Sequence, residues 1–151
     1  MKHLLLLAFA ALSLQAQASR VQGHAFFGLD NPPRGSFGNG SVGAGADVFL
    51  YKGAAFSPSL GYLFDYDGGG VAVATVNGSY HFLRGKGRFQ PFVSAGYGAL
   101  ANLGGGISLY NFGGGATYWF HKRLGFRAEV VNWQNNSHRE LTSLRFALSF
   151  R

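Results

Sequence analysis

The charged residues of the C-terminal third have the spacing of a buried ion-pair cluster. Arg127 and Glu129 are two positions apart, so on a β-strand they share one face. Their neighbours Phe126, Ala128 and Val130 are apolar, so the charged face must point inward. Glu129 then stands as the acid shared by two arginines, one from each of two adjoining strands. The predicted inward network consists of Arg127, Glu129, Arg145, Asp47 and Asp65.

A second group has the residue types of hydrolytic chemistry, because Ser137, His138 and Glu140 lie close together in sequence. Ser137 and His138 are adjacent in a polar connection, where their side chains diverge. A nucleophile and its base must instead lie within hydrogen-bond reach of each other. The sequence therefore predicts no catalytic residues and no enzymatic activity.

Two further patterns resemble ligand sites. Gly38-x-Gly40-x-x-Gly43 matches the dinucleotide fingerprint, but that motif needs a strand before it and a helix after it, and here a predicted strand follows. His24 and His81 have no carboxylate or third histidine at metal-site spacing, and the chain has no cysteine. We expect no cofactor and no metal.

The elements that carry these residues are predicted strands. After residue 18, small or polar residues alternate with apolar ones in stretches of about ten residues, which is typical of transmembrane barrel strands. Backbone groups in lipid must all be paired, so such a sheet must close on itself. We predict an all-β fold, a closed antiparallel up-and-down barrel. Its strands are Gln22–Leu29, Ser41–Tyr51, Ala55–Tyr66, Val71–Phe82, Phe89–Ala101, Ile107–Phe120, Gly125–Trp133 and Leu141–Phe150.

Several local features follow from this reading. Eight strands leave a narrow interior, which we expect to be filled mostly by Gly, Ser, Ala, Asn and Thr. Pro58 cannot donate a ladder hydrogen bond, so we expect a bulge there. Aromatic residues near strand ends are predicted to form two interfacial girdles. The girdle residues are Tyr51, Tyr66, Tyr80, Phe82, Tyr110, Tyr118, Trp119, Phe120 and Trp133.

The N-terminal segment has the pattern of a secretory signal. A positive start, Met1–His3, precedes the apolar run Leu4–Leu14, and Ala16-x-Ala18 is a cleavage pattern. The apolar run is shorter than the roughly 18 residues of a membrane helix. We therefore predict a cleaved signal peptide over 1–18 and a barrel domain over 19–151.

Composition and charge fit a surface that does not face water. Aromatic residues make up 16% and charged residues only 13%, against about 25% charged in soluble domains. A net charge of +7 invites a nucleic-acid interpretation. The cations, however, concentrate in three short connections that we place on one rim, where they face anionic lipid headgroups, so we expect no nucleic-acid partner. Those connections are Lys52-Gly53, Leu83–Arg88 and His121–Leu124; the longer ones are Asp30–Gly40, Asp67–Gly70, Asn102–Gly106 and Gln134–Glu140.

The last third of the chain resembles the OmpA-like outer-membrane β-barrel domain family. The resemblance rests on Gly125-Phe126-Arg127-Ala128-Glu129-Val130 and on alternating apolar residues up to Phe150. It implies an eight-stranded barrel in the outer membrane of a Gram-negative cell envelope. Expected partners are outer-membrane lipids, lipopolysaccharide and, during biogenesis, the barrel assembly machinery; the expected state is a monomer.

The function that follows is a structural or surface-interaction role, with the lumen plugged by polar and charged side chains. The alternative is a narrow channel for small solutes, which depends on whether Arg127, Glu129 and Arg145 close the lumen. A third hypothesis, a barrel enzyme that modifies lipid A, would need a Ser/His/acid set that converges near one rim.

Overall fold

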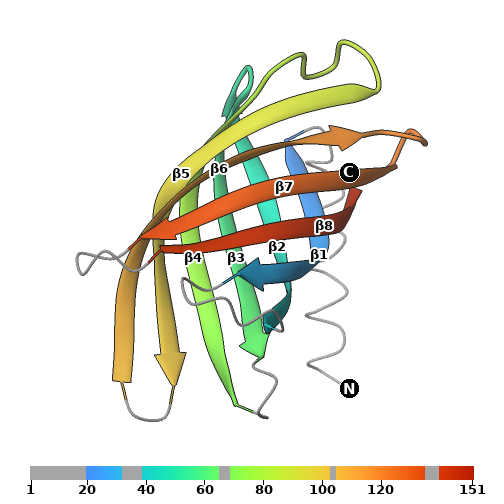
Figure 1. Cartoon of the computed structure of the whole chain (residues 1–151). Coiled ribbons are helices and arrows are strands. Elements are labelled where there is room, and N and C mark those ends of the chain that lie inside the picture. Colours follow the sequence, from blue (N-terminus) through green and yellow to red (C-terminus); the bar gives the residue numbers. More distant parts are fainter. Residues whose placement is uncertain (1–19, 32–38, 65–68, 103–104, 135–139) are drawn as a thin grey trace, which may run out of the picture.

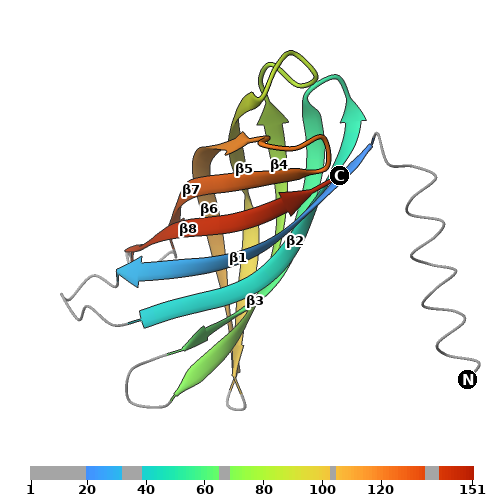
Figure 2. The ribbon, with the colours of Figure 1, turned by 90° about the vertical axis from the view of Figure 1, so that its right-hand side faces the viewer.

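Eight strands form one closed antiparallel barrel in the computed structural model, which describes residues 20–31, 39–64, 69–102, 105–134 and 140–151. Each strand pairs with the next along the chain, and the first pairs with the last (Figures 1 and 2). The predicted fold class is confirmed. No helix in these ranges is long and apolar enough to cross a membrane. The strands are β1 (Val21–Asn31), β2 (Asn39–Tyr51), β3 (Ala54–Phe64), β4 (Gly70–His81), β5 (Phe89–Asn102), β6 (Gly105–Tyr118), β7 (Leu124–Gln134) and β8 (Glu140–Phe150).

Pairing extends several strands beyond their predicted ends. β1 continues to Asn31, because its last residues pair with both β2 and β8. β5 and β6 run through most of the predicted loop Asn102–Gly106, and their register ends with Asn102 opposite Gly105. Antiparallel pairing satisfies the backbone there even where the sequence is rich in glycine.

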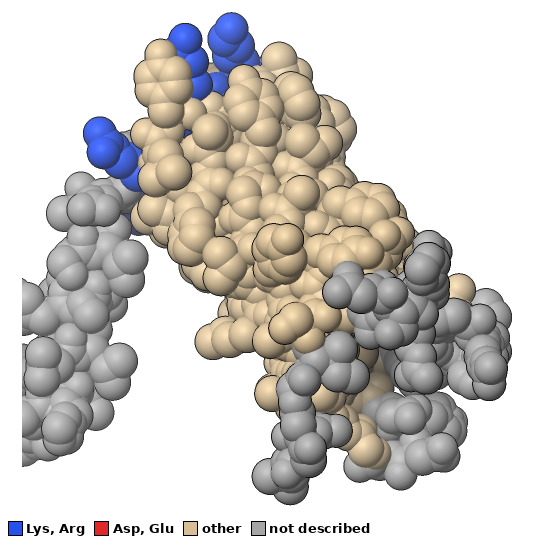
Figure 3. Space-filling view, turned by 90° about the vertical axis from the view of Figure 1, so that its left-hand side faces the viewer, with Lys and Arg blue, Asp and Glu red and all other residues tan. Residues whose placement is uncertain are grey.

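Side chains alternate between the two faces of the wall, except at the end of β2, where Leu50 and Tyr51 are both exposed. On β8, Leu144 and Phe146 are exposed, whereas Ser143 and Arg145 are buried. The other strands follow the parity predicted from sequence, and the outward strand side chains that the structure describes include no charged residue. Figure 3 shows one face of this wall, where the described surface below the cations is uncharged. An exposed apolar wall of this extent is typical of a surface that contacts lipid.

The two tryptophans are an exception to the predicted girdles. Trp119 and Trp133 are only 3% and 1% exposed and lie on the inward side, so their assignment to the girdles was wrong. Both occupy inward positions of the alternation, and parity overrides the preference of tryptophan for the interface. Tyr66 lies outside the described residues. The other predicted girdle residues are exposed: Tyr51, Tyr80, Phe82, Tyr110, Tyr118 and Phe120.

The bulge expected at Pro58 is also absent from the described ladders. β3 keeps one register with β4 across this position, with Pro58 opposite Val76. Against β2 the pairing is interrupted between Gly45–Ser59 and Val48–Phe56, yet the register is the same on both sides. The missing donor of proline therefore breaks the ladder locally without inserting a residue. The irregularity of this pair of strands lies between Phe49 and Tyr51, next to the turn.

The short connections and both described chain ends meet at one end of the barrel. The β2–β3 turn is Lys52-Gly53, with Lys52 at φ 48°. The backbone N–H of Phe49 donates to the Arg20 carbonyl, and that of Arg151 donates to the Arg123 carbonyl. Lysine and arginine side chains gather at this end (Figure 3). We call it the basic rim, made of Arg20, Lys52, Arg84, Lys86, Arg88, Lys122, Arg123 and Arg151.

Candidate functional site

The barrel brings four of the five predicted network residues together in its lumen. Arg127 and Glu129 occupy inward positions of β7, and Glu129 lies opposite Arg145 of β8. Asp47 reaches them from β2 on another part of the wall. All four are at least nine-tenths buried. Asp65 lies outside the described residues.

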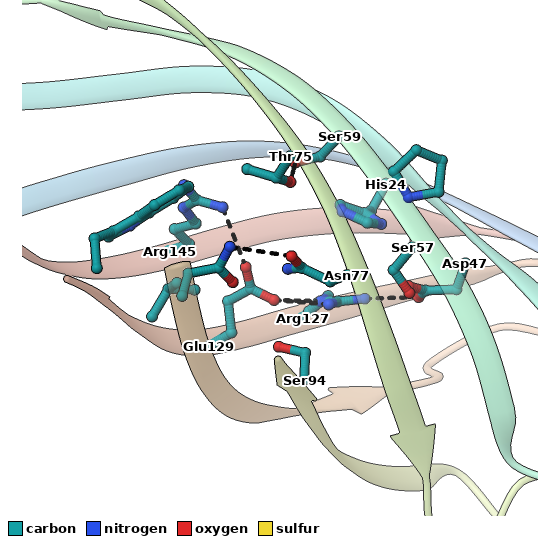
Figure 4. A pocket seen from close by; sticks show the side chains of 14 residues that line it. His24, Asp47, Ser57, Ser59, Thr75, Asn77, Ser94, Arg127, Glu129 and Arg145 are labelled. Carbon is teal, nitrogen blue, oxygen red and sulfur yellow. Dashed lines mark hydrogen bonds and ion pairs between the residues drawn. The ribbon is translucent and has the colours of Figure 1, made fainter. Parts of the chain in front are cut away.

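Arg127 is the centre of this cluster (Figure 4). Its Nη1 donates to Asp47 Oδ2 at 2.8 Å, while Nε and Nη2 both donate to Glu129 Oε2, at 2.9 and 2.7 Å. Its guanidinium also lies 3.9 Å from the ring centroid of Phe92. Hydrogen bonds between charged groups at these lengths are the strong class. The Arg127 guanidinium therefore binds two carboxylates, that of Asp47 on β2 and that of Glu129 on β7.

Arg145 is held more loosely. Its Nη1 lies 3.6 Å from Glu129 Oε1, which is an ion-pair distance longer than those made by Arg127. Its guanidinium lies over two aromatic rings, 4.5 Å from Phe26 and 5.3 Å from Trp133. Glu129 therefore lies between two arginines, as the sequence suggests, but it is bound more closely by one of them. We call Asp47, Arg127, Glu129 and Arg145 the charged layer.

A hydrogen-bonded chain leads from the charged layer toward the basic rim. Ser57 Oγ donates to Asp47 Oδ1 at 2.7 Å and lies 2.7 Å from Ser79 Oγ. His81 Nε2 follows at 3.2 Å from Ser79 Oγ, and Gln90 Nε2 lies 3.2 Å from His81 Nδ1. Trp119 Nε1 ends the chain by donating to Gln90 Oε1 at 2.9 Å. Sequence reasoning missed the roles of Ser57, Ser79 and Gln90, although strand parity already places all three on the inward face.

On the side of the lumen farther from the basic rim, a cluster of apolar side chains lies beside the buried polar pair Asp30 and Ser143. Val73, Leu109, Val131 and Trp133 are buried against one another, with relative exposures of 7% or less. Partly buried leucines pack against them: Leu63, Leu100 and Leu141. The prediction of an interior made mostly of small and polar residues was therefore wrong for this part of the lumen. We call Val73, Leu109, Val131 and Trp133 the apolar layer.

A small cavity lies between the two layers. Its volume is about 20 Å³, and its lining includes His24, Asn111, Trp133 and Arg145. One water molecule needs roughly 10–15 Å³ of such space. Four polar atoms of these lining residues have no hydrogen-bond partner in the described part of the chain: Nδ1 of His24, Oδ1 of Asn111, Nε1 of Trp133 and Nε of Arg145. The space matches a water molecule in size and polarity.

Ser79, His81 and Asp47 form a Ser–His–Asp grouping that the sequence did not predict. In a hydrolytic triad the serine and the acid lie on opposite ring nitrogens of the histidine. Here Ser79 Oγ and Asp47 Oδ2 both lie near Nε2, at 3.2 and 3.6 Å, and Gln90 occupies Nδ1. His81 is also only 2% exposed. The grouping lacks both the geometry and the access of a triad. Ser137 and His138, the residues weighed for hydrolysis from sequence, lie outside the described residues.

Comparison with known proteins identifies the fold. No family model and no curated protein matches the sequence. The N-terminal β-barrel domain of Pseudomonas aeruginosa OprF matches with a TM-score of 0.67 at 18% identity, over 87% of this chain and 98% of that one. Neisserial surface protein A matches with a TM-score of 0.61 at 13% identity, over 86% of this chain and 94% of that one. A structure from the de novo design of transmembrane β-barrels matches with a TM-score of 0.60 at 15% identity, over 87% of this chain and 94% of that one. The chain shares the closed eight-stranded barrel fold of these proteins.

Proposed function

We propose that this protein is a small outer-membrane barrel with a structural or surface-interaction role and a lumen closed by its own side chains. The observation that carries the proposal is the filling of the lumen. A charged layer centred on Arg127 and an apolar layer around Trp133 leave a cavity of only about 20 Å³. The uncharged outer wall supports placement in a bilayer, where a charge near the midplane would cost roughly 2–4 kcal/mol for arginine or lysine.

The proposal extends to biogenesis and surroundings. Residues 1–18 are removed as a signal peptide, which leaves Ser19 as the first residue of the mature chain. The barrel assembly machinery then inserts the chain as a monomer, in contact with outer-membrane lipids and lipopolysaccharide. The intact mass of the membrane-bound form tests the cleavage directly, because retention of Met1 would contradict it.

The decisive experiment combines location and permeability. The full chain is expressed in a Gram-negative host, the outer membrane is isolated, and gel mobility is compared before and after boiling. A folded barrel migrates differently in the two lanes. The purified barrel is then placed in liposomes, and swelling in a small sugar is measured. We expect outer-membrane recovery, a heat-dependent mobility shift and no swelling above that of empty liposomes.

A pair of variants tests the orientation of the wall in the same assay. Phe146→Asp places a charge on an exposed outward position of β8 and should sharply lower the yield of folded barrel in the outer membrane. Ser149→Ala alters a buried inward position of the same strand, where the hydroxyl has no hydrogen-bond partner in the described part of the chain, and should leave the yield unchanged. Equal yields would contradict the lipid-facing wall, and swelling by the parent protein would favour the narrow-channel alternative.

A further inference from the structure

We propose that the basic rim is a binding surface for the phosphate headgroups of anionic phospholipids in the leaflet that surrounds it. The inference rests on the bilayer placement proposed above. It concerns the outside of one end of the barrel, and none of the lumen groups takes part in it.

The basic rim carries positive charge on all of its eight named side chains. Eight lysines and arginines meet there from three turns and from both described chain ends. The acidic side chains that the structure describes, those of Asp30, Asp47 and Glu129, are all buried in the lumen. No described acidic side chain therefore lies on the rim to neutralise these cations. A surface of one sign at the edge of a barrel attracts the opposite charge of a lipid leaflet.

An exposed aromatic residue lies within two positions of a cation at several places on the basic rim. Tyr51 precedes Lys52, and the Lys52 Nζ lies 5.1 Å from the Tyr51 ring centroid. Aromatic residues within two positions of a rim cation also mark the other strand ends there. These are Phe82 before Arg84, Phe89 after Arg88, Phe120 before Lys122 and Phe150 before Arg151, and all four aromatic side chains are exposed.

This pairing sets the depth of the cations. Exposed aromatic rings at the strand ends of a barrel form girdles at the headgroup level of a bilayer, and lysine and arginine side chains extend from there toward the aqueous side. Cations one or two residues beyond such rings therefore lie at the level of lipid phosphates. A soluble acidic polymer would not require the rings. The combination favours phospholipid headgroups as the ligand.

Two of the eight cations, Arg84 and Arg151, lie over aromatic rings at the mouth of the lumen. Arg84 lies 3.7 Å from the Phe49 ring centroid and donates to the Lys52 carbonyl, while Arg151 lies 4.2 Å from the Trp119 ring centroid and donates to the Lys122 carbonyl. Partial burial and the nearby Arg151 guanidinium lower the pKa of Arg84. Lys52, Lys86 and Lys122 are exposed, and so are Arg20, Arg88 and Arg123, so headgroups can reach these six of the eight cations.

The test measures lipid selectivity of the full chain. The folded barrel in detergent is titrated with equal amounts of dimyristoylphosphatidylglycerol and dimyristoylphosphatidylcholine, and bound lipids are counted by native mass spectrometry. A lysine near the surface contributes about fivefold to the affinity for an anionic headgroup. We expect a preference of roughly tenfold or more for phosphatidylglycerol, which weakens as NaCl rises from about 0.05 to 0.5 M because the rim is open to screening.

Two triple variants separate charge from fold. K52Q/K86Q/K122Q should lower the preference severalfold, although Arg20, Arg88 and Arg123 remain exposed on the rim, and K52R/K86R/K122R should keep it. Equal binding of the two lipids by the parent would overturn the inference, as would an unchanged preference in the glutamine variant. If inorganic phosphate competed as well as the lipid did, the site would bind a free anion and the inference would fail. A chain without heat-dependent mobility would contradict the proposed function itself, whereas a folded chain without lipid preference would contradict only this inference.

Discussion

The charged layer and the apolar layer fill the same lumen by opposite means. On β7 the change takes place within two residues, because Glu129 faces the arginines and Val131 packs against Trp133. In the charged layer each side chain needs particular partners, one of which, Asp47, comes from a distant strand. In the apolar layer any side chain of suitable volume contributes. The stability lost by a substitution in the charged layer should therefore depend on which partner is left without its ion pair. In the apolar layer it should depend on how much side-chain volume is removed.

Arg127→Ala should give the largest effect, because it leaves both Asp47 and Glu129 buried without their closest cation. Asp47 would keep only Ser57 at 2.7 Å and His81 at 3.6 Å, and Glu129 would keep Arg145 at 3.6 Å. Breaking a buried pair from one side costs about 3–5 kcal/mol. We expect a loss near 5 kcal/mol in the free energy of unfolding, measured with urea in liposomes.

The same cluster supplies the control for that measurement. Glu129→Ala leaves Arg127 bound to Asp47, so it should cost less than Arg127→Ala. Adding Asp47→Asn to Arg127→Ala should recover part of the loss, since one uncompensated acid is removed. Equal stabilities for Arg127→Ala and the parent would show that the charged layer does not hold the lumen together.

Trp133→Ala tests the apolar layer and should cost about 3 kcal/mol, because truncation of a buried tryptophan leaves a cavity. Trp133 is 1% exposed and also lies near the Arg145 guanidinium. Trp133→Phe, which retains most of the volume, should cost clearly less in the same urea titration. If both variants lost the same stability, a specific contact of the indole would matter more than its volume.

Gly98→Ala should destabilise by about 1–3 kcal/mol, the usual range for overpacking. A methyl group on Gly98 would lie 2.7 Å from the Trp133 ring, which is too close for either group. Gly78→Ala on the outer wall is the matched control, because the nearest atom would be 4.0 Å away. Thermal unfolding in detergent should separate the two. An unaffected Gly98→Ala variant would show that the apolar layer is loosely packed.

Salt should have the smallest effect. The ion pairs of the charged layer are buried, and buried pairs are screened much less than exposed ones. An increase in NaCl from about 0.05 to 0.5 M should therefore change the free energy of unfolding by less than about 1 kcal/mol. A drop comparable to that of Arg127→Ala would mean that water reaches the charged layer.

Sequence alone was sufficient for the strand order and for the inward face of Asp47, Arg127, Glu129 and Arg145, because both depend on an alternation with a period of two. The sequence did not show which ion pairs of the charged layer are the shortest. Asp47 is 80 residues from Arg127, and their 2.8 Å contact depends on the closure of the barrel. From sequence, Glu129 is the shared acid of the network; the distances make Arg127 its centre. The apolar layer was missed because its four residues lie within three positions of connections that the sequence predicts as loops.

Closure of the barrel by β1 and β8 also has a kinetic consequence. Gly23 lies opposite Phe150, so the first and last strands of the described chain are partners. Such pairing has a very high sequence separation, which slows folding. Until β8 is in place, β1 has an unpaired edge that could bind another chain. Pairing of β1 with β8 closes the sheet in the finished barrel. During folding, β1 keeps its unpaired edge for longest, so we expect aggregation to begin at this strand.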